Sequence, residues 1–427
     1  MALSDASAYP SASLWRHPDF MKLWIGETVS VFGSQFTMLA MPLIATLLLN
    51  ATAVEMGILN AVDTLPFLLV GLAAGVWVDR LRRRPILILA DVGRALVLSW
   101  VPLAAWLGIL RLEHLYVVGL LVGLFTVFFD VAYQAYLPAL VNRSQLVEGN
   151  SKLEVSRSAS TLAGPALAGV FIQAFSAPLA MALDAASFLW SAAFVALIRK
   201  PEPAPESADS RSFWSDLREG LGVVFGDTRL RAIASCTGTG NLFNSAIWSL
   251  YVLFAVRELG LDPARLGFVF SVGSASALAG VLLAGWSSQR FGLGSTIVGS
   301  ALGWGLAGVP LVFASPDTAV FLLTLGWLIG SLANPIYNIN QVSLRQAIVP
   351  DQLQGRMNAT MRFIVWGTMP LGALIGGALG EAIGLRPAIA VFALGELLSF
   401  LWLLPSPVPG LDRIPAWVPS GSDSSPS

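Results

Sequence analysis

Twelve long apolar runs dominate the pattern of hydrophobic and polar positions along the chain. A helix needs about 20 apolar residues to cross the hydrocarbon core of a bilayer, and each run is close to that length. The runs cover residues 20–48, 53–77, 86–108, 114–140, 157–175, 179–198, 231–256, 264–287, 294–314, 318–344, 358–380 and 386–404. The pattern therefore predicts an all-α integral membrane protein with twelve transmembrane helices.

Polar segments divide the runs into two sets of six. Residues 199–230 begin with a Pro/Glu/Ser-rich stretch typical of a linker, and FWSDLREGLGVVF follows as a predicted amphipathic helix on the membrane surface. The end of the chain is rich in Pro and Ser, as disordered segments are. We expect two six-helix bundles at 1–198 and 231–404, a cytoplasmic linker at 199–230, and a disordered cytoplasmic tail at 405–427.

The distribution of Lys and Arg predicts the orientation. With the N-terminus inside the cell, all but four of the 25 basic residues fall on the cytoplasmic side. The four are Arg111, Arg257, Arg265 and Arg386. Because cytoplasmic loops are enriched in Lys and Arg, we expect a multi-pass protein of the inner (plasma) membrane with both termini in the cytoplasm.

Composition narrows the classes of partner. Of the 427 residues, 55% are hydrophobic and 12% are charged, whereas soluble domains carry about 25% charged residues. The net charge of -1 gives no basic field that would recruit nucleic acid. Cys236 is the only cysteine, and His17 and His114 lie near predicted helix ends, so a disulfide framework or metal site is not expected. We expect the lipid bilayer as solvent, no nucleic-acid partner, no cofactor, no metal and a monomer.

Short motifs repeat between the halves. GVWVDRLR at 75–82 follows the second run, and GWSSQRFG at 285–292 follows the eighth. DVAY at 130–133 and NPIY at 334–337 occupy the fourth and tenth runs. Parallel repeats of six helices describe one transporter architecture, with the substrate site between the halves. On these motifs the chain resembles the major facilitator superfamily over about residues 14–404, which implies the major facilitator fold.

The loop after the second run carries the most specific part of this resemblance. Gly75, Asp79, Arg80, Arg83 and Arg84 match the family signature between helices 2 and 3. Arg82 stands where the family has glycine. The segments LPFLLVGLAAGVWVDRLRRRP and AYQAYLPALV are similar to the branch that holds macrolide-efflux and siderophore-export proteins.

The fifth run contains a second family motif. Gly164, Pro165 and Gly169 resemble the glycine-proline signature of proton-coupled antiporters, with Ala168 in place of a glycine. The resemblance implies antiport, and it names no substrate.

The charged loop has two interpretations. Arg82, Arg83 and Arg84 can lie among anionic lipid head groups, each contributing about 1 kcal/mol of attraction. Asp79 ends a helix, where the helix dipole disfavours a carboxylate, so it needs another partner. The resemblance implies that this partner lies in the other half.

Asp91 and Arg94, three residues apart on one helix face, can join that loop. We therefore predict a conformational latch, and a local Asp91–Arg94 ion pair is the alternative. Its candidate residues are Gly75, Asp79, Arg80, Arg83, Asp91 and Arg94.

Carboxylates inside apolar runs are the candidates for proton coupling. Ionisable groups at these depths are costly and therefore functional candidates. Glu27, Asp63 and Asp130 lie in helices that, by the resemblance, border the central cavity or the seam between the halves. For Asp184 and Glu396 a structural hydrogen bond is the favoured interpretation.

Amides and aromatic rings predict a substrate cavity in the second half. They recur at spacings of three and four, which places them on one face of a helix. The candidates are Asn241, Asn244, Trp248, Asn334, Tyr337, Asn338, Gln341 and Trp366. Such groups suit an amphipathic substrate, and interhelical hydrogen bonding is the alternative for each single residue.

The favoured function is proton-coupled export of a hydrophobic or amphipathic small molecule by alternating access, with the substrate and protons as partners. Uptake or facilitated transport without protons is the alternative within transport. A membrane enzyme would need HExxH, GxSxG or paired Cys and His, which the sequence lacks, so no catalytic residue is expected. A receptor or scaffold with a transport fold is another alternative. Such a protein would not need carboxylates inside its membrane helices, and this chain has them. The sequence contains no Walker motif, so ATP is not expected as the energy source.

Overall fold

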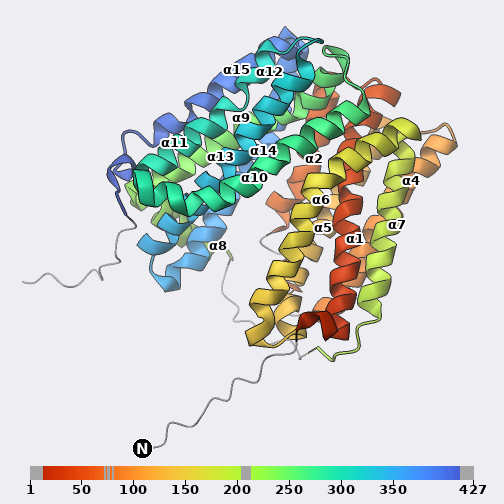
Figure 1. The fold of residues 1–427 in the computed structure, drawn as a ribbon, viewed down its shortest axis with the longest axis horizontal. Coiled ribbons are helices and arrows are strands. Elements are labelled where there is room, and N and C mark those ends of the chain that lie inside the picture. Colours follow the sequence, from red (N-terminus) through yellow and green to blue (C-terminus); the bar gives the residue numbers. More distant parts are fainter. Residues whose placement is uncertain (1–12, 72–73, 75–76, 79–80, 203–212, 414–427) are drawn as a thin grey trace, which may run out of the picture. The chain divides into compact units, whose positions relative to one another are not determined.

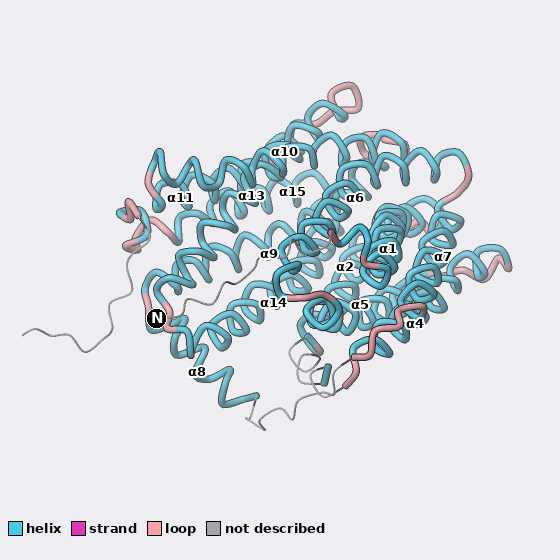
Figure 2. Tube along the Cα trace, turned by 60° about the horizontal axis from the view of Figure 1, so that its bottom comes forward, coloured by secondary structure: helices cyan, strands magenta, loops and turns pink. Residues whose placement is uncertain are grey.

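The computed structural model describes residues 13–71, 74, 77–78, 81–202 and 213–413. Within these ranges the structure is helical and contains no strand, as Figure 2 shows. The prediction of an all-α chain is confirmed. Gly75, Asp79 and Arg80 of the predicted latch lie outside the described residues, as do residues 414–427 of the predicted tail.

Each of the twelve predicted runs contains a helix (Figure 1). In the first half these are α1 (Pro18–Leu43), α2 (Ala53–Leu69), α4 (Arg83–Trp106), α5 (Leu112–Leu140), α6 (Leu146–Ala174) and α7 (Ala177–Ala196). In the second half they are α9 (Thr228–Arg257), α10 (Pro263–Phe291), α11 (Leu293–Leu306) with α12 (Val309–Phe313), α13 (Ala319–Ile348), α14 (Asp351–Ile383) and α15 (Leu385–Leu398). A π-helical turn at Ile44–Leu48 extends α1, and α8 (Phe213–Gly226) is the predicted amphipathic helix.

Ten of these segments, counted over the described residues, are long and apolar enough to cross a membrane. The predicted crossings outside that set are α2, of which 17 residues are described, and α6. The first half of α6 is rich in Ser and charged residues, so this helix begins well before the predicted apolar run at 157–175. Hydrophobicity marks the membrane-embedded part of a helix, and the helix itself continues into the polar interface.

The described residues form two compact units. The first comprises Met1–Met41 and Leu69–Ala208, and the second comprises Pro42–Leu68 and Asp209–Ser427. The division at Ala208 falls inside the predicted linker. Residues 42–68 pack with the second unit, although the sequence places them in the predicted bundle 1–198.

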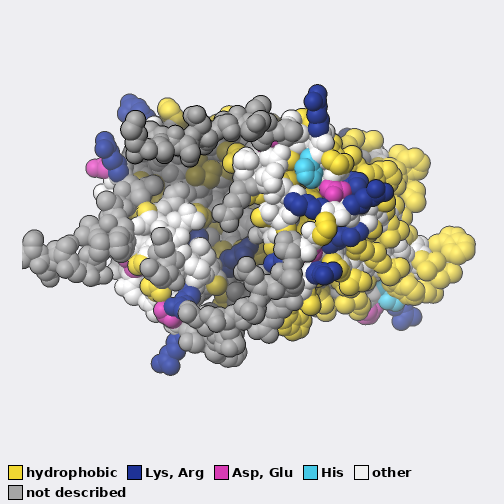
Figure 3. Space-filling model, turned by 90° about the horizontal axis from the view of Figure 1, so that it is seen from below, with side chains coloured by type: hydrophobic (Ala, Val, Ile, Leu, Met, Phe, Trp, Pro, Cys, Tyr) yellow, Lys and Arg dark blue, Asp and Glu magenta, His cyan; other side chains and the backbone are white. Residues whose placement is uncertain are grey.

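In the first unit, hydrogen bonds hold the beginnings of α1 and α4 beside the ends of α5 and α7. Such a pattern requires neighbouring helices to alternate in direction. The bonds run from Lys22 Nζ to Leu197 O (2.8 Å), from Arg84 Nε to Val195 O (3.2 Å) and from Lys200 Nζ to Leu140 O (2.9 Å). Figure 3 views the protein from below. Lys and Arg side chains gather on the face seen there, and apolar side chains cover its flank at the right.

Helix ends in the second unit follow from local sequence. Asp227 caps α9 by accepting hydrogen bonds from the backbone amides of Arg229 (2.8 Å) and Leu230 (3.2 Å). Burial alone would raise the pKa of Asp227, but the bonds from Arg229 and these amides lower it on balance. Its stabilising contribution is therefore complete above the ordinary pKa of an aspartate and is lost as the pH falls. Gly292 (φ +86°) and Gly384 (φ +91°) supply the turns into α11 and α15, because few other residues adopt such angles.

Glycines on α14 let two helices approach its backbone. A side chain at Gly376 would meet the Ala246 carbonyl of α9, and one at Gly377 would meet the Ala53 carbonyl of α2 at 2.7 Å. Small residues at such spacings permit close helix packing in membranes. The Glu381 carboxylate of α14 also accepts a hydrogen bond from the Ala53 amide (3.1 Å), at the beginning of α2. These contacts explain why residues 42–68 belong to the second unit.

The amphipathic helix α8 packs against α14. A side chain at Gly220 would meet the Arg356 carbonyl, and the Arg356 guanidinium pairs with Glu219. Residues 405–413, which the sequence assigns to the disordered tail, are folded: the amides of Leu293 and Gly294 donate to the carbonyls of Asp412 (3.1 Å) and Leu411 (2.7 Å). The beginning of α11 therefore holds this part of the chain.

Replacing Gly377 by Val should destabilise the second unit by about 1–3 kcal/mol, because the added methyl groups have no room against α2. Cys236 is the only cysteine and is fully buried, so its reaction with a thiol-reactive dye on heating reports unfolding. Gly299→Val on α11 is the control, because a side chain there meets nothing within 4 Å. Equal unfolding temperatures for the two variants would contradict this packing argument.

Candidate functional site

A buried ion pair on α4 forms the centre of the first unit's charged cluster. The Arg94 guanidinium donates to the Asp91 carboxylate, and both side chains are almost completely buried. The rings of Phe129 on α5 and Phe188 on α7 lie 4.2 and 4.0 Å from that guanidinium. Aromatic faces stabilise a desolvated cation, so three helices hold Arg94 in place. The predicted local pair is present, while its predicted partners Asp79 and Arg80 lie outside the described residues.

Glu27 of α1 belongs to the same cluster. Its Oε2 atom is buried and has no hydrogen-bond partner within the part of the chain that the structure describes. The charged groups that act on it electrostatically are Arg94, Asp91, Asp130 and Arg157. These groups lie on α4, α5 and α6, and the cluster also includes Asp184 of α7, on which Arg94 and Asp91 act.

The other membrane carboxylates have different surroundings. Asp130 is exposed on α5, one turn before the buried Tyr133. Asp184 on α7 is buried and accepts a hydrogen bond from Ser187 Oγ (3.1 Å), beside Gly33 of α1. Asp63 is exposed on α2, in the second unit. Of the three predicted proton-coupling residues, Glu27 and Asp130 thus belong to the first unit and Asp63 to the second.

The glycine-proline motif packs α6 against α1. Gly164, Pro165 and Gly169 are all buried, and a side chain at Gly164 would meet Gln35 of α1. Hydrogen bonds continue this seam toward the beginnings of both helices. They join the hydroxyls of Thr28 and Ser156 (2.8 Å) and run from Ser160 Oγ to Val31 O (2.7 Å). This seam thus joins α1, which carries Glu27, to α6, which carries Arg157 and the motif.

Arg83 and Arg84 have protein partners, whereas one interpretation of the sequence places them among lipid head groups. The partner of their backbone amides is Glu202. Its carboxylate accepts the backbone amides of Arg83 (2.7 Å) and Arg84 (3.2 Å) and pairs with the Arg83 guanidinium at 3.5 Å. The Arg84 side chain donates to the Val195 carbonyl at the end of α7. Free amides and the dipole at the beginning of a helix attract a carboxylate, and the linker supplies one. Among the three arginines only Arg82 is exposed.

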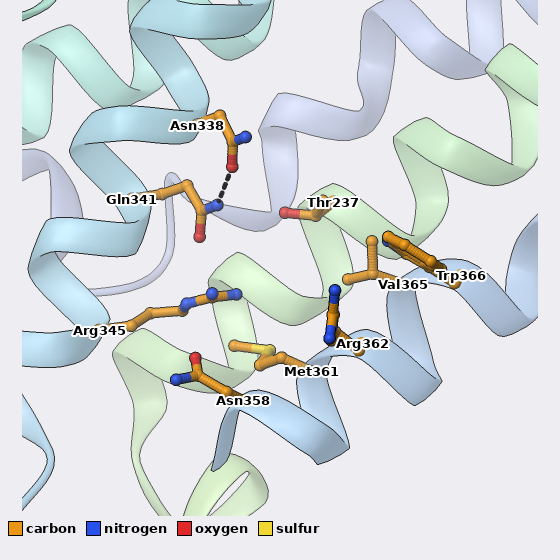
Figure 4. A pocket seen from close by; sticks show the side chains of 9 residues that line it. All are labelled: Thr237, Asn338, Gln341, Arg345, Asn358, Met361, Arg362, Val365 and Trp366. Carbon is orange, nitrogen blue, oxygen red and sulfur yellow. Dashed lines mark hydrogen bonds between the residues drawn. The ribbon is translucent and has the colours of Figure 1, made fainter. Parts of the chain in front are cut away.

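The second unit contains a polar pocket of about 360 Å³ (Figure 4). Its walls come from α9, α13 and α14. The lining residues are Thr237, Asn338, Gln341, Arg345, Asn358, Met361, Arg362, Val365 and Trp366.

Three of the predicted cavity residues line this pocket, and a fourth supports it. Asn338, Gln341 and Trp366 are part of the wall, and Gln341 Nε2 donates to Asn338 Oδ1 at 2.9 Å. Tyr337 is buried behind the wall, with its hydroxyl 2.7 Å from that of Thr237.

The remaining four cavity candidates do not line the pocket. Asn241 Nδ2 donates to the Val365 carbonyl (3.2 Å), and Asn244 Nδ2 donates to Glu396 Oε1 (2.9 Å). Trp248 packs in a ring cluster, with its ring centroid 5.3 Å from that of Trp327. Asn334 is exposed on α13. Interhelical bonding, the alternative interpretation, describes Asn241 and Asn244, and the Asn244 bond is also the structural role expected for Glu396.

Sequence reasoning missed six lining residues. Thr237, Asn358, Met361 and Val365 carry no distinctive pattern, but Arg345 and Arg362 do. Each stands four residues from a predicted cavity residue, Gln341 or Trp366, and so shares its helix face. In the sequence, both contribute to the cytoplasmic excess of basic residues that predicts the orientation. No group of three or more His, Cys, Asp or Glu suited to a metal ion occurs among the described residues.

Residues 10–420 match the protein family described as transmembrane secretion effector. The chain is 28% identical to the multidrug efflux pump Tap of Mycolicibacterium fortuitum, an alignment that covers 86% of this chain and 90% of that protein. It is 24% identical to macrolide efflux protein A of Streptococcus pyogenes, again over 86% and 90%. An uncharacterised transporter of Bacillus subtilis, YfiS, is 25% identical over 90% and 91%.

Solved structures of transporters share the fold. A bacterial homologue of the iron transporter ferroportin in its inward-facing state has a TM-score of 0.74, with 15% identity over 92% of this chain and 99% of that one. The nucleoside transporter NupG has a TM-score of 0.71, with 14% identity over 91% and 98%. At such identities the likeness concerns the fold alone.

Neutralising one member of the Asp91–Arg94 pair should destabilise the first unit more than neutralising both. Asp91→Asn or Arg94→Gln leaves an uncompensated buried charge, which costs about 3–5 kcal/mol, whereas the double variant leaves none. Thermal unfolding followed by circular dichroism measures this order. A double variant less stable than both single variants would show that the pair is not the stabilising unit.

Proposed function

Because the chain belongs to the transmembrane secretion effector family, within the drug-efflux branch of the major facilitator superfamily, we propose that it exports a hydrophobic or amphipathic small molecule in exchange for protons. The family and the named relatives are multi-pass membrane transporters. That relationship supports small-molecule transport. Export, proton coupling and the absence of enzymatic activity are parts of the proposal.

The charged cluster of the first unit is the observation that supports proton coupling. Two carboxyl groups, Asp91 and Asp130, and two guanidinium groups, Arg94 and Arg157, act electrostatically on Glu27. A buried carboxylate is stable when a cation or a proton compensates for it. Asp91 already pairs with Arg94, so Glu27 needs Arg157 or a proton for its compensation. The buried, unpartnered Oε2 atom of Glu27 makes that residue the favoured carrier.

Proton binding can be coupled to movement through α1 and α6. Protonation of Glu27 would weaken its attraction to Arg157, and the motif at Gly164 and Pro165 lies on the same α6 helix. Movement of α6 along the hydrogen-bonded seam with α1 would then follow the protonation state. The close approach of α2 to α14 at Gly377 is a second element that alternating access would open and close.

The proposal includes the orientation of the protein in the cell membrane. With both termini in the cytoplasm, protons enter along their gradient while the substrate leaves. The predicted latch at Gly75, Asp79 and Arg80 would close the cytoplasmic side, and a monomer would suffice, because each chain carries both halves.

Glu27→Gln should abolish accumulation driven by a proton gradient while leaving the folded protein intact. The assay uses everted vesicles with an imposed gradient and radiolabelled erythromycin or 2-naphthylacetate as transport probes. Asp130→Asn should reduce accumulation in part. Glu396→Gln is the matched control, because glutamine keeps an acceptor for the Asn244 bond.

Three results would contradict the proposed coupling. Accumulation could be unaffected by a protonophore, as a facilitative carrier predicts. The probe could move out of the everted vesicles, as uptake into the cell predicts. Finally, Glu27→Gln, Asp63→Asn and Asp130→Asn could all retain transport driven by the gradient.

A further inference from the structure

The pocket of the second unit brings together two guanidinium groups and no carboxylate. Figure 4 shows Arg345 extending from α13 and Arg362 standing on α14, on the other side of the pocket. None of the nine lining residues is Asp or Glu. Two like charges in one pocket repel each other, and the repulsion is stronger in the low dielectric of a helix bundle than in water.

Neither arginine has an acidic partner among the described residues. Arg345 Nε is buried and forms no hydrogen bond with any of them. The Arg362 guanidinium lies 5.2 Å from the ring centroid of Trp366, a contact that leaves its N–H groups available. Arg356, near the beginning of α14, is different, because it pairs with Glu219 of α8. Arginines on this helix are therefore paired where an acid is near, and the pocket lacks one.

The remaining wall suits an amphiphile with a charged oxygen group. The amides of Asn338, Gln341 and Asn358 add hydrogen-bond donors around the two guanidiniums. Met361, Val365 and Trp366 provide an apolar surface beside them. Guanidinium groups bind carboxylates and phosphates through paired, charge-assisted hydrogen bonds. The volume of about 360 Å³ is at the lower end of the range for small-molecule sites.

We propose that this pocket binds the anionic oxygen group, carboxylate or phosphate, of the amphiphile that the protein exports. The substrate class is therefore organic anions and zwitterions with an apolar body. This inference rests on the proposed function where it identifies the bound molecule as the exported substrate. Binding itself needs no proton gradient. A phospholipid head group is the other source of the same chemistry.

The test is binding of matched probes to the purified full chain in nanodiscs of phosphatidylcholine. The probes are radiolabelled 2-naphthylacetate, its uncharged amide and 2-(2-naphthyl)ethylammonium, which share one ring system. The carboxylate should bind about tenfold more tightly than the amide, and the ammonium more weakly than both. Arg362→Gln should remove most of the advantage of the carboxylate while changing amide binding less than about twofold.

Two further variants make the result specific. Arg345→Gln should act like Arg362→Gln, and because Arg362 is exposed, its variant remains informative if Arg345→Gln fails to fold. Arg231→Gln on α9 is the control for loss of one positive charge, because Arg231 is exposed and lies outside the pocket. Equal affinities for carboxylate and amide, or equal losses in Arg231→Gln and Arg362→Gln, would overturn the proposal.

Nanodiscs with phosphatidylglycerol distinguish the two sources. If this lipid raises the melting temperature of the wild type but not of Arg362→Gln, and displaces 2-naphthylacetate, a head group fills the pocket and the substrate assignment is wrong. Retained, Arg362-dependent probe binding in these discs supports it. Carboxylate-selective binding without proton-driven transport would overturn the coupling alone, so the two proposals fail separately.

Discussion

A charge inside an apolar helix bundle is stable only where a partner replaces the water that it has lost, and this constraint connects the main features of the protein. Arg94 meets it through the opposite charge of Asp91 and the rings of Phe129 and Phe188. Glu27 meets it in part, because one of its carboxylate oxygens is buried without a hydrogen bond. A charge paired with an opposite charge holds helices together, whereas a charge without such a pair can exchange a proton or bind an ion. The same distinction separates Arg356 from Arg345 and Arg362.

Close helix packing is the second constraint, and it depends on small residues that let helix backbones approach each other. Gly164 brings α6 against α1, and Gly376 and Gly377 bring α9 and α2 against α14. Apolar side chains gain little by leaving lipid for another helix, so backbone approach and hydrogen bonds such as Thr28–Ser156 carry much of the association. The glycine-proline motif therefore has a direct structural role, in addition to the antiport that the family resemblance implies.

Helix positions were predictable, because the bilayer demands long apolar runs whatever the tertiary contacts are. Helix ends were less predictable: α6 and α14 begin earlier than their apolar runs, since polar residues continue the helices at the interface. Of the predicted cavity residues, Asn338, Gln341 and Trp366 line the pocket, whereas Asn241 and Asn244 bond to neighbouring helices. The four amides among these residues recur at similar spacings along their helices. Only the neighbouring helix decides whether such an amide bonds to it or faces a pocket.

The sequence by itself determined the apolar runs and the superfamily, and it marked the acidic residues that are candidates for proton coupling, because these depend on hydrophobicity, local motifs and residue type. Tertiary structure decided which charges are compensated. It placed Glu202 at the beginning of α4 and brought Arg345 and Arg362 into one pocket without an acid. Partners come from helices far apart in the chain, so the compensation of a buried charge cannot be read from its own segment.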